Sequence, residues 1–326
     1  MPLDLSIIIV QYKTPELLER CISSIHKYYG GISFEIIVVN NDSDDTTKSH
    51  IISKFSEIIW LDSGYNAGFS RANNMGVHQA TGEYLLLLNP DSEVNEGFLK
   101  KLLDFYKPND MHNELGLLGC RIINPADQSL LIGSGKGFPA ISKEIKANPL
   151  FIFLTRSVYK GKPRKYNPYI MHYQNHEIDF VSGACVMIKR EKIIKDNIFL
   201  DEDFFLYSED VEWAYRVQKA GYKNYFCSEV EVYHVNSAST GFAKSKFFQM
   251  QISNYLFYLK AYGLFRYLLF GSILFLNFTS NLFLLKGAKK YNDEKDHYVV
   301  FKKYFFSILK RFYWSSEKNR SYLKYD

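Results

Sequence analysis

Gly82-Glu-Tyr-Leu-Leu-Leu-Leu-Asn-Pro-Asp-Ser-Glu-Val94 is an apolar run that ends in polar residues around a proline. Its apolar part, from Tyr84 to Leu88, holds no charged or amide side chain, and Pro90 ends it abruptly. A short apolar run between Gly and Pro is typical of a strand buried on both faces, as in a parallel sheet. Ligands of open α/β sheets bind beyond the carboxyl ends of the strands. The sequence therefore predicts that Asn89 and Asp91 lie at a functional site.

The residues before this stretch alternate between strand-like and helical patterns. Runs rich in Ile and Val at residues 5–10, 34–39 and 58–61 predict three strands. A helical pattern follows the first run, the polar run Asn40–Asp45 follows the second, and a Gly- and Asn-rich loop entering a helix at residues 64–80 follows the third. Since crossovers between parallel strands are right-handed, we expect an α/β fold with a largely parallel central sheet, flanking helices, and loops gathered along one edge.

The alternation continues beyond this stretch and then weakens. A helix is predicted around residues 97–106 and a strand around residues 115–120. Residues 124–176 are irregular and rich in Gly, Pro, Lys and aromatic residues. A loop-rich segment of that length in a compact domain is typically functional or mobile.

Regular patterns return in the part of the chain that follows. Residues 178–188 have a strand-like composition. A helix with one apolar stripe comes next, and Ser208 is its expected N-cap. Glu209 and Asp210 then fall in the first turn of this helix, where acidic side chains favour the helix dipole.

The composition is that of a globular protein. The chain has 326 residues, of which 47% are hydrophobic and 17% aromatic, enough for a substantial core in one or two domains. Its four cysteines are far apart and form no Cys-x-x-Cys pair, so we expect a reducing compartment and no structural zinc. The N-terminus lacks the basic region and apolar core of a signal peptide, which predicts a protein that stays in the cytoplasm.

The positive charge is concentrated at the C-terminus. Residues 286–326 hold eleven Lys or Arg and five Asp or Glu, a net charge of +6, so the rest of the chain carries −1 of the total of +5. This distribution argues against nucleic acid as a partner of the main body, and it favours an anionic surface near the C-terminus.

The C-terminal third also contains apolar segments suited to a membrane. Tyr267–Leu285 is almost uniformly apolar, but polar residues such as Asn277 and Asn281 in its second half favour a helix that lies on a bilayer over one that crosses it. The segment after it places Phe301, Phe305 and other apolar residues on one face and basic residues elsewhere. A helical cap on the catalytic domain and a homodimer interface remain alternatives.

Short motifs at the expected strand ends carry a resemblance to a known family. They are Val38-Val39-Asn40-Asn41-Asp42-Ser43, Asn66-x-Gly68-Phe69 with Asn73 and Gly76, Leu88-Asn89-Pro90-Asp91, Gly183-Ala184, and Glu209-Asp210 followed by Arg216. In this order and spacing the chain resembles family 2 glycosyltransferases of the GT-A type, particularly bacterial rhamnosyltransferase-like members, over residues 3–240. The resemblance implies a Rossmann-like GT-A catalytic domain at residues 1–245 and a helical, basic amphipathic, membrane-associating region at residues 246–326.

The resemblance implies a divalent cation, Mg²⁺ or Mn²⁺, on the diphosphate of the sugar donor. A cation held by hard oxygen ligands neutralises the charge that develops on a departing diphosphate. Asp91 is the implied metal ligand, and His234 is a second candidate ligand. Relatives usually carry Asp-x-Asp at this place, whereas this chain has the uncharged Asn89 as the first residue, so metal binding is expected to be weaker. A simple turn after a buried strand is the alternative interpretation.

Asp210 matches the general base of the family. An acceptor hydroxyl that attacks the anomeric carbon loses its proton, and a carboxylate opposite the leaving group takes it. The resemblance implies a single displacement with inversion, with Gly183, Ala184 and Glu209 on the acceptor side. Ordinary helix capping is the alternative for both acidic residues.

Binding of the nucleotide-sugar donor, a dTDP- or UDP-sugar, is expected at the ends of the first strands. The resemblance assigns it to a set of polar residues: Gln11, Tyr12, Asn41, Asp42, Arg71, Asn73 and Asn89. Relatives commonly have an acidic residue where Asn40 or Asn41 stands, so the amide of Asn41 is the expected partner of the pyrimidine. A solvated turn and an exposed helical arginine are the alternatives.

Together these expectations describe an inverting glycosyltransferase. It would transfer a sugar to a polyprenyl-diphosphate-linked saccharide during surface polysaccharide synthesis, and L-rhamnose from dTDP-rhamnose is the candidate donor. The enzyme would be bound peripherally at the cytoplasmic face of the bacterial inner membrane. A sugar nucleotidyltransferase is disfavoured because no Gly- and Arg/Lys-rich phosphate loop follows Val10, and a dehydrogenase because no G-x-G-x-x-G follows there either. Asn40 and Asn89 keep an inactive membrane-bound scaffold of the same fold as an alternative.

Overall fold

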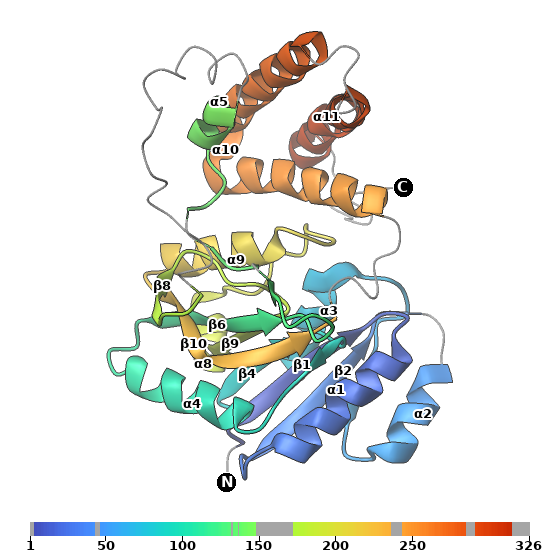
Figure 1. Ribbon diagram of the computed structural model, residues 1–326, viewed down its shortest axis with the longest axis vertical. Helices are drawn as coiled ribbons and strands as arrows, with labels where there is room; N and C mark the ends of the chain where they lie inside the picture. Colours follow the sequence, from blue (N-terminus) through green and yellow to red (C-terminus); the bar gives the residue numbers. More distant parts are fainter. Residues whose placement is uncertain are drawn as a thin grey trace. The chain divides into compact units, whose positions relative to one another are not determined.

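The computed structural model describes residues 3–42, 46–131, 133–135, 137–147, 172–235, 243–284 and 291–314. The chain divides into two compact units (Figure 1). The first unit comprises residues 1–136, 167–205 and 209–241, and the second comprises residues 137–166, 206–208 and 242–326.

The first unit is built on one sheet, which has ten strands among the described residues. Its order is β3-β2-β1-β4-β9-β6-β10-β5, with β7 paired to β6 and β8 paired to β10. The strands are β1 (Leu5–Gln11), β2 (Phe34–Asn40), β3 (Ile59–Asp62), β4 (Tyr84–Leu88), β5 (Ser92–Glu93), β6 (Leu115–Ile123), β7 (Leu130–Leu131), β8 (His176–Ile178), β9 (Cys185–Lys189) and β10 (Lys223–His234).

The sheet is mixed, and its parallel part is the part that the alternating pattern predicted. Strands β1 to β4 are mutually parallel where they pair, and β10 is parallel to β6. Strand β9 lies between β4 and β6 and is antiparallel to both. The expected single strand at residues 178–188 is interrupted, because Phe180 forms a bridge with Gly135 in place of continuing the strand. The α/β fold class with flanking helices is confirmed.

The helices of the first unit flank this sheet (Figure 1). They are α1 (Pro15–Tyr28), α2 (Thr46–Lys54), α3 (Gly68–Gln79), α4 (Phe98–Asn109), α8 (Arg190–Asp196) and α9 (Glu209–Lys219). Pro15 is the first residue of α1, where its missing N–H is not needed. The hydroxyl of Thr14 does not cap α1; it donates to Oε1 of Gln11 at 3.3 Å.

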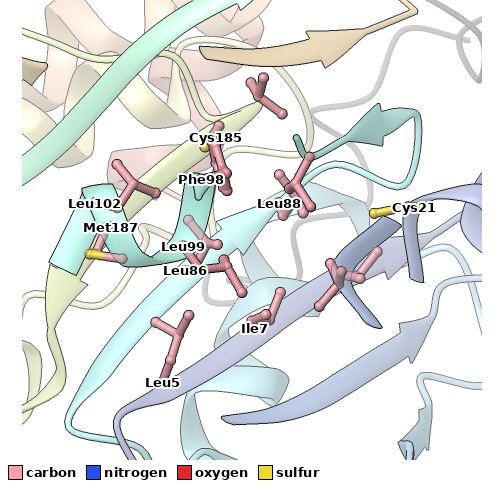
Figure 2. Packing of buried hydrophobic residues seen from close by; sticks show 14 of the residues in the cluster. Leu5, Ile7, Cys21, Leu86, Leu88, Phe98, Leu99, Leu102, Cys185 and Met187 are labelled. Carbon is pink, nitrogen blue, oxygen red and sulfur yellow. The ribbon is translucent and has the colours of Figure 1, made fainter. Parts of the chain in front are cut away.

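Both faces of β4 are covered, which explains why every residue from Tyr84 to Leu88 is apolar. On one face, Leu86 and Leu88 pack in a buried cluster with residues of α1 and α4, such as Cys21 and Phe98 (Figure 2). The side chains of Leu85 and Leu87, on the other face, are equally buried and lie outside that cluster. A strand enclosed in this way holds its carboxyl end, with Asn89 and Asp91, in a fixed position.

The described helices of the second unit are α5 (Ile141–Ala147), α10 (Ala243–Leu284) and α11 (Tyr291–Trp314). Gly263 interrupts α10 with φ 78° and ψ 174°, so α10 is two helices joined at a sharp bend. The rings of Tyr258 and Phe270 stack at 3.7 Å. Twelve residues of continuous helix would separate them by about 18 Å along the axis, so the two halves of α10 fold against each other.

Gly68, the first residue of α3, is the glycine whose replacement is most costly to the fold near the site. Its φ is +82°, and an added Cβ would lie 2.5 Å from the carbonyl oxygen of Phe205. Gly64 has a similar φ of +75° but open space around its Cβ position. We predict that Gly68→Ala lowers the free energy of unfolding by about 3 kcal/mol or more, because strain and a backbone clash add.

Gly64→Ala is the matched control, and it should cost only the left-handed strain of about 1–2 kcal/mol. Urea denaturation followed by circular dichroism measures both variants. Equal losses for the two substitutions would contradict the importance of the Phe205 contact.

Candidate active site

The polar ends of several strands meet at one edge of the sheet. Strand β6 is antiparallel to β9, which is antiparallel to β4, so β6 and its parallel neighbour β10 run in the same direction as β1 to β4. The carboxyl ends of these strands therefore share an edge with the amino end of β9. Gln11, Asn40, Asn89 and His234 all lie at this edge, together with Ala184.

Asn89, Asp91 and His234 converge at the end of β4. The imidazole Nε2 of His234 lies 3.0 Å from Oδ1 of Asp91 and 3.2 Å from the side-chain nitrogen of Asn89. The side chains of His234 and Asp91 are 10% and 8% exposed, so the pair is nearly buried but open to a small ligand. Asn89 and Asp91 thus form one cluster of polar atoms with His234, which follows Asn89 by 145 residues.

Backbone pairing brings these residues together. The amide of Val235 donates to the carbonyl oxygen of Asp91 at 3.0 Å, and His234 stands opposite Ser92 in the antiparallel pairing of β10 with β5. The amide of Ser92 donates to the carbonyl oxygen of Asn89 at 3.1 Å and closes the turn around Pro90. The cluster is therefore fixed by the sheet and not by its own side chains.

The donor atoms of this cluster fit a divalent cation. They comprise one carboxylate, one imidazole nitrogen and one amide group that also carries an oxygen, which are all ligand types for Mg²⁺ or Mn²⁺. Within the described ranges no group of three or more His, Cys, Asp and Glu side chains is arranged to hold a metal ion. The third residue here is Asn89, whose neutral amide contributes no charge.

Asp210 lies in the first turn of α9 and is held by two backbone amides. Oδ2 accepts from Gly183 N–H at 3.0 Å, and Oδ1 accepts from the amide of Val211 at 2.8 Å. Burial raises the pKa of the Asp210 carboxyl, while these two N–H groups oppose the rise. An oriented carboxylate with an elevated pKa is suited to proton transfer.

Glu209 is more deeply buried than its neighbour. The residue is 5% exposed, and its Oε2 has no hydrogen-bond partner. Burial, followed by the charge of Asp210, holds the pKa of Glu209 well above its ordinary range. The protonated form of Glu209 is therefore favoured, and the pair carries about one negative charge in place of two.

The backbone of Gly183 and Ala184 links the two halves of the candidate site. Gly183 donates its N–H to Asp210, and the carbonyl oxygen of Ala184 accepts the N–H of Asn89 at 3.0 Å. A Cβ added at Gly183 would lie 3.4 Å from the ring of Phe69 and 3.5 Å from Cβ of Asp210, so the glycine sits between them. Both residues were predicted on the acceptor side, and their role here as a backbone link was not predicted.

Ser208 is not the N-cap that the sequence suggested. N-cap residues adopt an extended backbone, whereas Tyr207 and Ser208 have φ values of 68° and 61°. Two successive residues in the left-handed region lead into Glu209. The carboxylate of Asp210 instead accepts the amide of Val211, the third residue of α9, and this bond fixes its position before any substrate binds.

The side chain of Asn41 is already engaged within the protein. Its oxygen accepts from Ala67 N–H at 2.8 Å, and its nitrogen donates to Oδ1 of Asn66 and to the carbonyl oxygen of Gly68, both at 3.2 Å. These bonds tie the end of β2 to the loop before α3. The oxygen of Gln11 similarly accepts from the amide of Thr14 at 3.0 Å. Both residues lie at the expected edge, and both shape the loops there.

The remaining predicted donor residues are spread over two regions. Tyr12 and Asp42 are half-buried at the ends of β1 and β2. Asn73 is 2% exposed and donates to the carbonyl oxygen of Phe69 within α3 at 2.9 Å. Arg71 lies 3.9 Å from a carboxylate oxygen of Glu202. The structure therefore places Tyr12 and Asp42 at the edge and engages Asn73 inside its own helix.

Two hydrogen bonds around the site were not predicted from the sequence. The carbonyl oxygen of Phe205 accepts from Phe69 N–H at 2.7 Å and positions the ring beside Gly183. The hydroxyl of Ser134 accepts from Ser182 N–H at 3.0 Å. The available signals were the Gly-Phe pair at 68–69 and a Gly-Ser-Gly at 133–135 within an irregular stretch.

The raised pKa of Glu209 predicts how stability depends on pH. A carboxyl whose pKa is higher in the folded state stabilises the fold at low pH, and that stability is lost as pH rises from its unfolded value through its folded value. We predict that the wild type loses about 1–2 kcal/mol relative to Glu209→Gln between pH 4.5 and pH 8, because the amide does not ionise.

Chemical denaturation at the two pH values measures this difference. Glu96→Gln is the control, since it makes the same substitution at an exposed position. Parallel pH profiles for wild type and Glu209→Gln would contradict the burial of an ionisable Glu209.

Comparison with curated proteins finds relatives that act in glycan assembly. The low-salt glycan biosynthesis hexosyltransferase Agl10 of Haloferax volcanii is 28% identical over 240 residues, covering 71% of this chain and 67% of its own length. The N-acetylglucosaminyl-diphospho-decaprenol L-rhamnosyltransferase of Mycobacterium tuberculosis is 23% identical over 248 residues, covering 73% of this chain and 78% of its own length.

Solved structures share the fold at lower sequence identity. S. aureus TarS 1–349 in complex with UDP has a TM-score of 0.50 at 14% identity, covering 89% of this chain and 73% of that one. GalNAc-T7 with UDP, GalNAc and Mn²⁺ has a TM-score of 0.50 at 17% identity, covering 72% of this chain and 43% of that one.

A family model supplies the assignment itself. The model of glycosyl transferase family 2 matches residues 6–196, which span β1 to α8 and more than half of the chain. The match contains Asn89, Asp91 and the backbone link at Gly183, and α9 with Asp210 and β10 with His234 follow it. The chain belongs to glycosyl transferase family 2.

Proposed function

We propose that this glycosyltransferase transfers a sugar from a nucleotide-diphosphate sugar to a lipid-linked saccharide, with inversion at the anomeric carbon. The observation that carries the proposal is the link through Gly183 and Ala184, which joins a carboxylate suited to proton transfer to a cluster suited to a cation. The acceptor class is supported by the mycobacterial relative, whose name describes a decaprenol diphosphate acceptor. L-Rhamnose from dTDP-rhamnose is the donor to test first, and a UDP-sugar is the alternative.

Asp210 is the proposed base. The acceptor hydroxyl attacks the anomeric carbon, the bond from that carbon to the diphosphate oxygen breaks, and the proton of the hydroxyl goes to the carboxylate of Asp210. The carboxylate accepts the N–H groups of Gly183 and Val211 on different oxygens, and a carboxylate has further lone pairs that can take the incoming proton. A single base suffices for inversion, and no covalent intermediate on the enzyme is required.

Asp91, His234 and Asn89 are the proposed holders of a divalent cation. The ion supplies charge neutralisation for the departing diphosphate when it is bound. Mg²⁺ in phosphate sites is typically held by one or two carboxylates, with substrate oxygens and water completing its coordination, so a site with a single charged ligand is adequate. The neighbour solved with Mn²⁺ and UDP supports a cation in this fold.

The polar strand ends beside this cluster are the proposed donor site. Tyr12 and Asp42 flank the edge, and the loop held by Asn41 forms its floor. We propose that the enzyme works at the cytoplasmic face of the inner membrane, which agrees with the four buried, unpaired cysteines of a reducing compartment. Glu209, buried behind Asp210, orients the base and does not itself accept the proton.

Replacing the proposed base, Asp210, distinguishes an effect on sugar transfer from an effect on donor binding. We predict that Asp210→Asn lowers the rate of sugar transfer at least a hundredfold, the lower end of the usual contribution of a general base, while donor affinity changes less than about threefold. The wild-type rate should rise with pH through the elevated pKa of Asp210 and then level. Radiolabelled transfer and donor titration measure the two quantities.

Asp104→Asn is the control for this experiment, since Asp104 is 61% exposed on α4. It should transfer sugar at the wild-type rate. Full turnover by Asp210→Asn would remove Asp210 as the base.

Restoring a charge at Asn89 tests the cation site. We predict that Asn89→Asp lowers the Kd for Mn²⁺ about tenfold, because a second carboxylate beside Asp91 adds ligand charge. His234→Ala should weaken Mn²⁺ binding. Electron paramagnetic resonance titration of free Mn²⁺ measures both.

Asn113→Asp adds the same charge at the opposite edge of the sheet, where Asn113 precedes β6 and is exposed. Its Mn²⁺ affinity should equal that of the wild type. An unchanged Kd in Asn89→Asp would place the cation elsewhere.

A further inference from the structure

One face of the second half of α10 is apolar and exposed. Six large apolar side chains there are 41–82% exposed: Leu264, Phe265, Leu268, Leu269, Phe275 and Leu276. Leu264, Leu268 and Phe275 are spaced by four and then seven residues, as are Phe265, Leu269 and Leu276, so they form a single stripe along the helix, and we call this set the apolar stripe. Such a contiguous exposed stripe is typical of an interaction surface, whereas scattered apolar residues are not.

The opposite face of the same helix is packed against α11. The rings of Tyr267 and Phe305 stack at 4.2 Å, and the hydroxyl of Tyr267 donates to the carbonyl oxygen of Phe305 at 2.8 Å. Further along, Phe278 contacts Phe301 at 5.6 Å and His297 at 6.3 Å between ring centroids. The helix therefore already has an intramolecular partner, and the apolar stripe faces away from it except at Phe275, whose ring centroid lies 6.3 Å from that of Tyr298.

The helix differs in burial from the core helix of a soluble protein. Within the described residues, the segment Phe248–Asn281 is long and apolar enough to cross a membrane by length and composition. Only 28% of its most apolar window is buried inside the protein. Most of the apolar surface of this window is therefore not covered by the chain itself and is open to contact with a partner.

The charge of both helices favours an anionic environment. α10 contains four basic residues and no acidic residue, and α11 contains five basic and three acidic residues, the acidic ones near its start. Arg266, Lys302 and Lys303 are exposed in this region. Anionic lipid headgroups would attract these side chains, whereas a second copy of the chain would bring like charges together.

We propose that residues 264–284 of α10 bind the surface of an anionic bilayer, lying in its interface with the apolar stripe in the acyl region. The inference rests on the proposed function only in one respect, which is that a lipid-linked acceptor would be found at the membrane. The stripe supplies buried apolar area and the basic residues supply electrostatic attraction, the two components of interfacial binding. The lipid partner is thus a general anionic surface and not a specific headgroup.

The packing of α11 argues that this helix lies on the bilayer and does not cross it. α11 runs antiparallel to the second half of α10, since Tyr267 contacts Phe305 whereas Phe278 contacts His297. A crossing helix would carry this stretch of α11, with the exposed Lys302 and Lys303, to the depth of the hydrocarbon. The bend at Gly263 likewise prevents Phe248–Asn281 from acting as one straight span.

Vesicle binding of the full chain tests the surface. With vesicles of phosphatidylcholine containing 30% phosphatidylglycerol, the double variant Leu268→Ser and Leu269→Ser should bind about tenfold more weakly than the wild type. Met250→Ser is the matched control, because Met250 is 44% exposed on the same α10 but outside the stripe. Wild-type binding should also weaken with added salt and with pure phosphatidylcholine vesicles.

Measurements of depth in the bilayer distinguish a helix that lies on the surface from one that crosses the membrane. Single cysteines replacing Phe265, Leu269 and Leu276 carry a fluorophore that lipid-bound nitroxides quench at known depths; the native cysteines are buried and remain unlabelled. A lying helix places all three labels at the same shallow depth. A crossing helix would separate the first and last by about 16 Å and overturn the proposal.

Two other results would also overturn it. If vesicle binding is unchanged in the double variant, the apolar stripe is not the contact with the bilayer. If light scattering shows a shift from dimer to monomer in that variant while vesicle binding is unchanged, the apolar stripe binds a second copy of the chain. The vesicles contain neither donor nor acceptor, so these results are independent of whether sugar transfer occurs. Donor binding measured on the same variants should be unchanged.

Discussion

The backbone of two consecutive residues, Gly183 and Ala184, holds the candidate active site together. One donates an N–H to the carboxylate of Asp210, and the other accepts the N–H of Asn89. Because both bonds are made by the backbone at the start of β9, the distance between the proposed base and the proposed cation cluster is set by the sheet. A site built in this way is preorganised, since no side chain has to find its partner when substrates bind.

The charge distribution of the site follows from burial. Glu209 has an elevated pKa and an unpartnered oxygen, so it adds little negative charge to that of Asp210. At the other end Asn89 replaces a carboxylate by an amide beside Asp91 and His234. Burial at one end and an amide at the other thus limit the negative charge of the site, which lowers the repulsion that a bound diphosphate would meet.

The sequence predicted the features that depend on local pattern. The buried strand ending at Leu88, the alternation up to β4 and the position of Asp210 in the first turn of α9 follow from hydrophobic runs and helix signals. The contacts of Gly183, the engagement of Asn41 with Ala67 and the antiparallel β9 depend on which strands become neighbours. That register is set by tertiary packing between residues far apart in sequence, so pattern alone does not reveal it.

The central claim is that this site binds a nucleotide-diphosphate sugar together with a cation. Thermal unfolding of the full chain with UDP-, dTDP- and GDP-sugars, each with and without Mn²⁺, tests it most directly, since a ligand that binds only the folded state raises Tm. We expect a higher Tm with a pyrimidine sugar nucleotide, and only when Mn²⁺ is present. An unchanged Tm with every sugar nucleotide would contradict it.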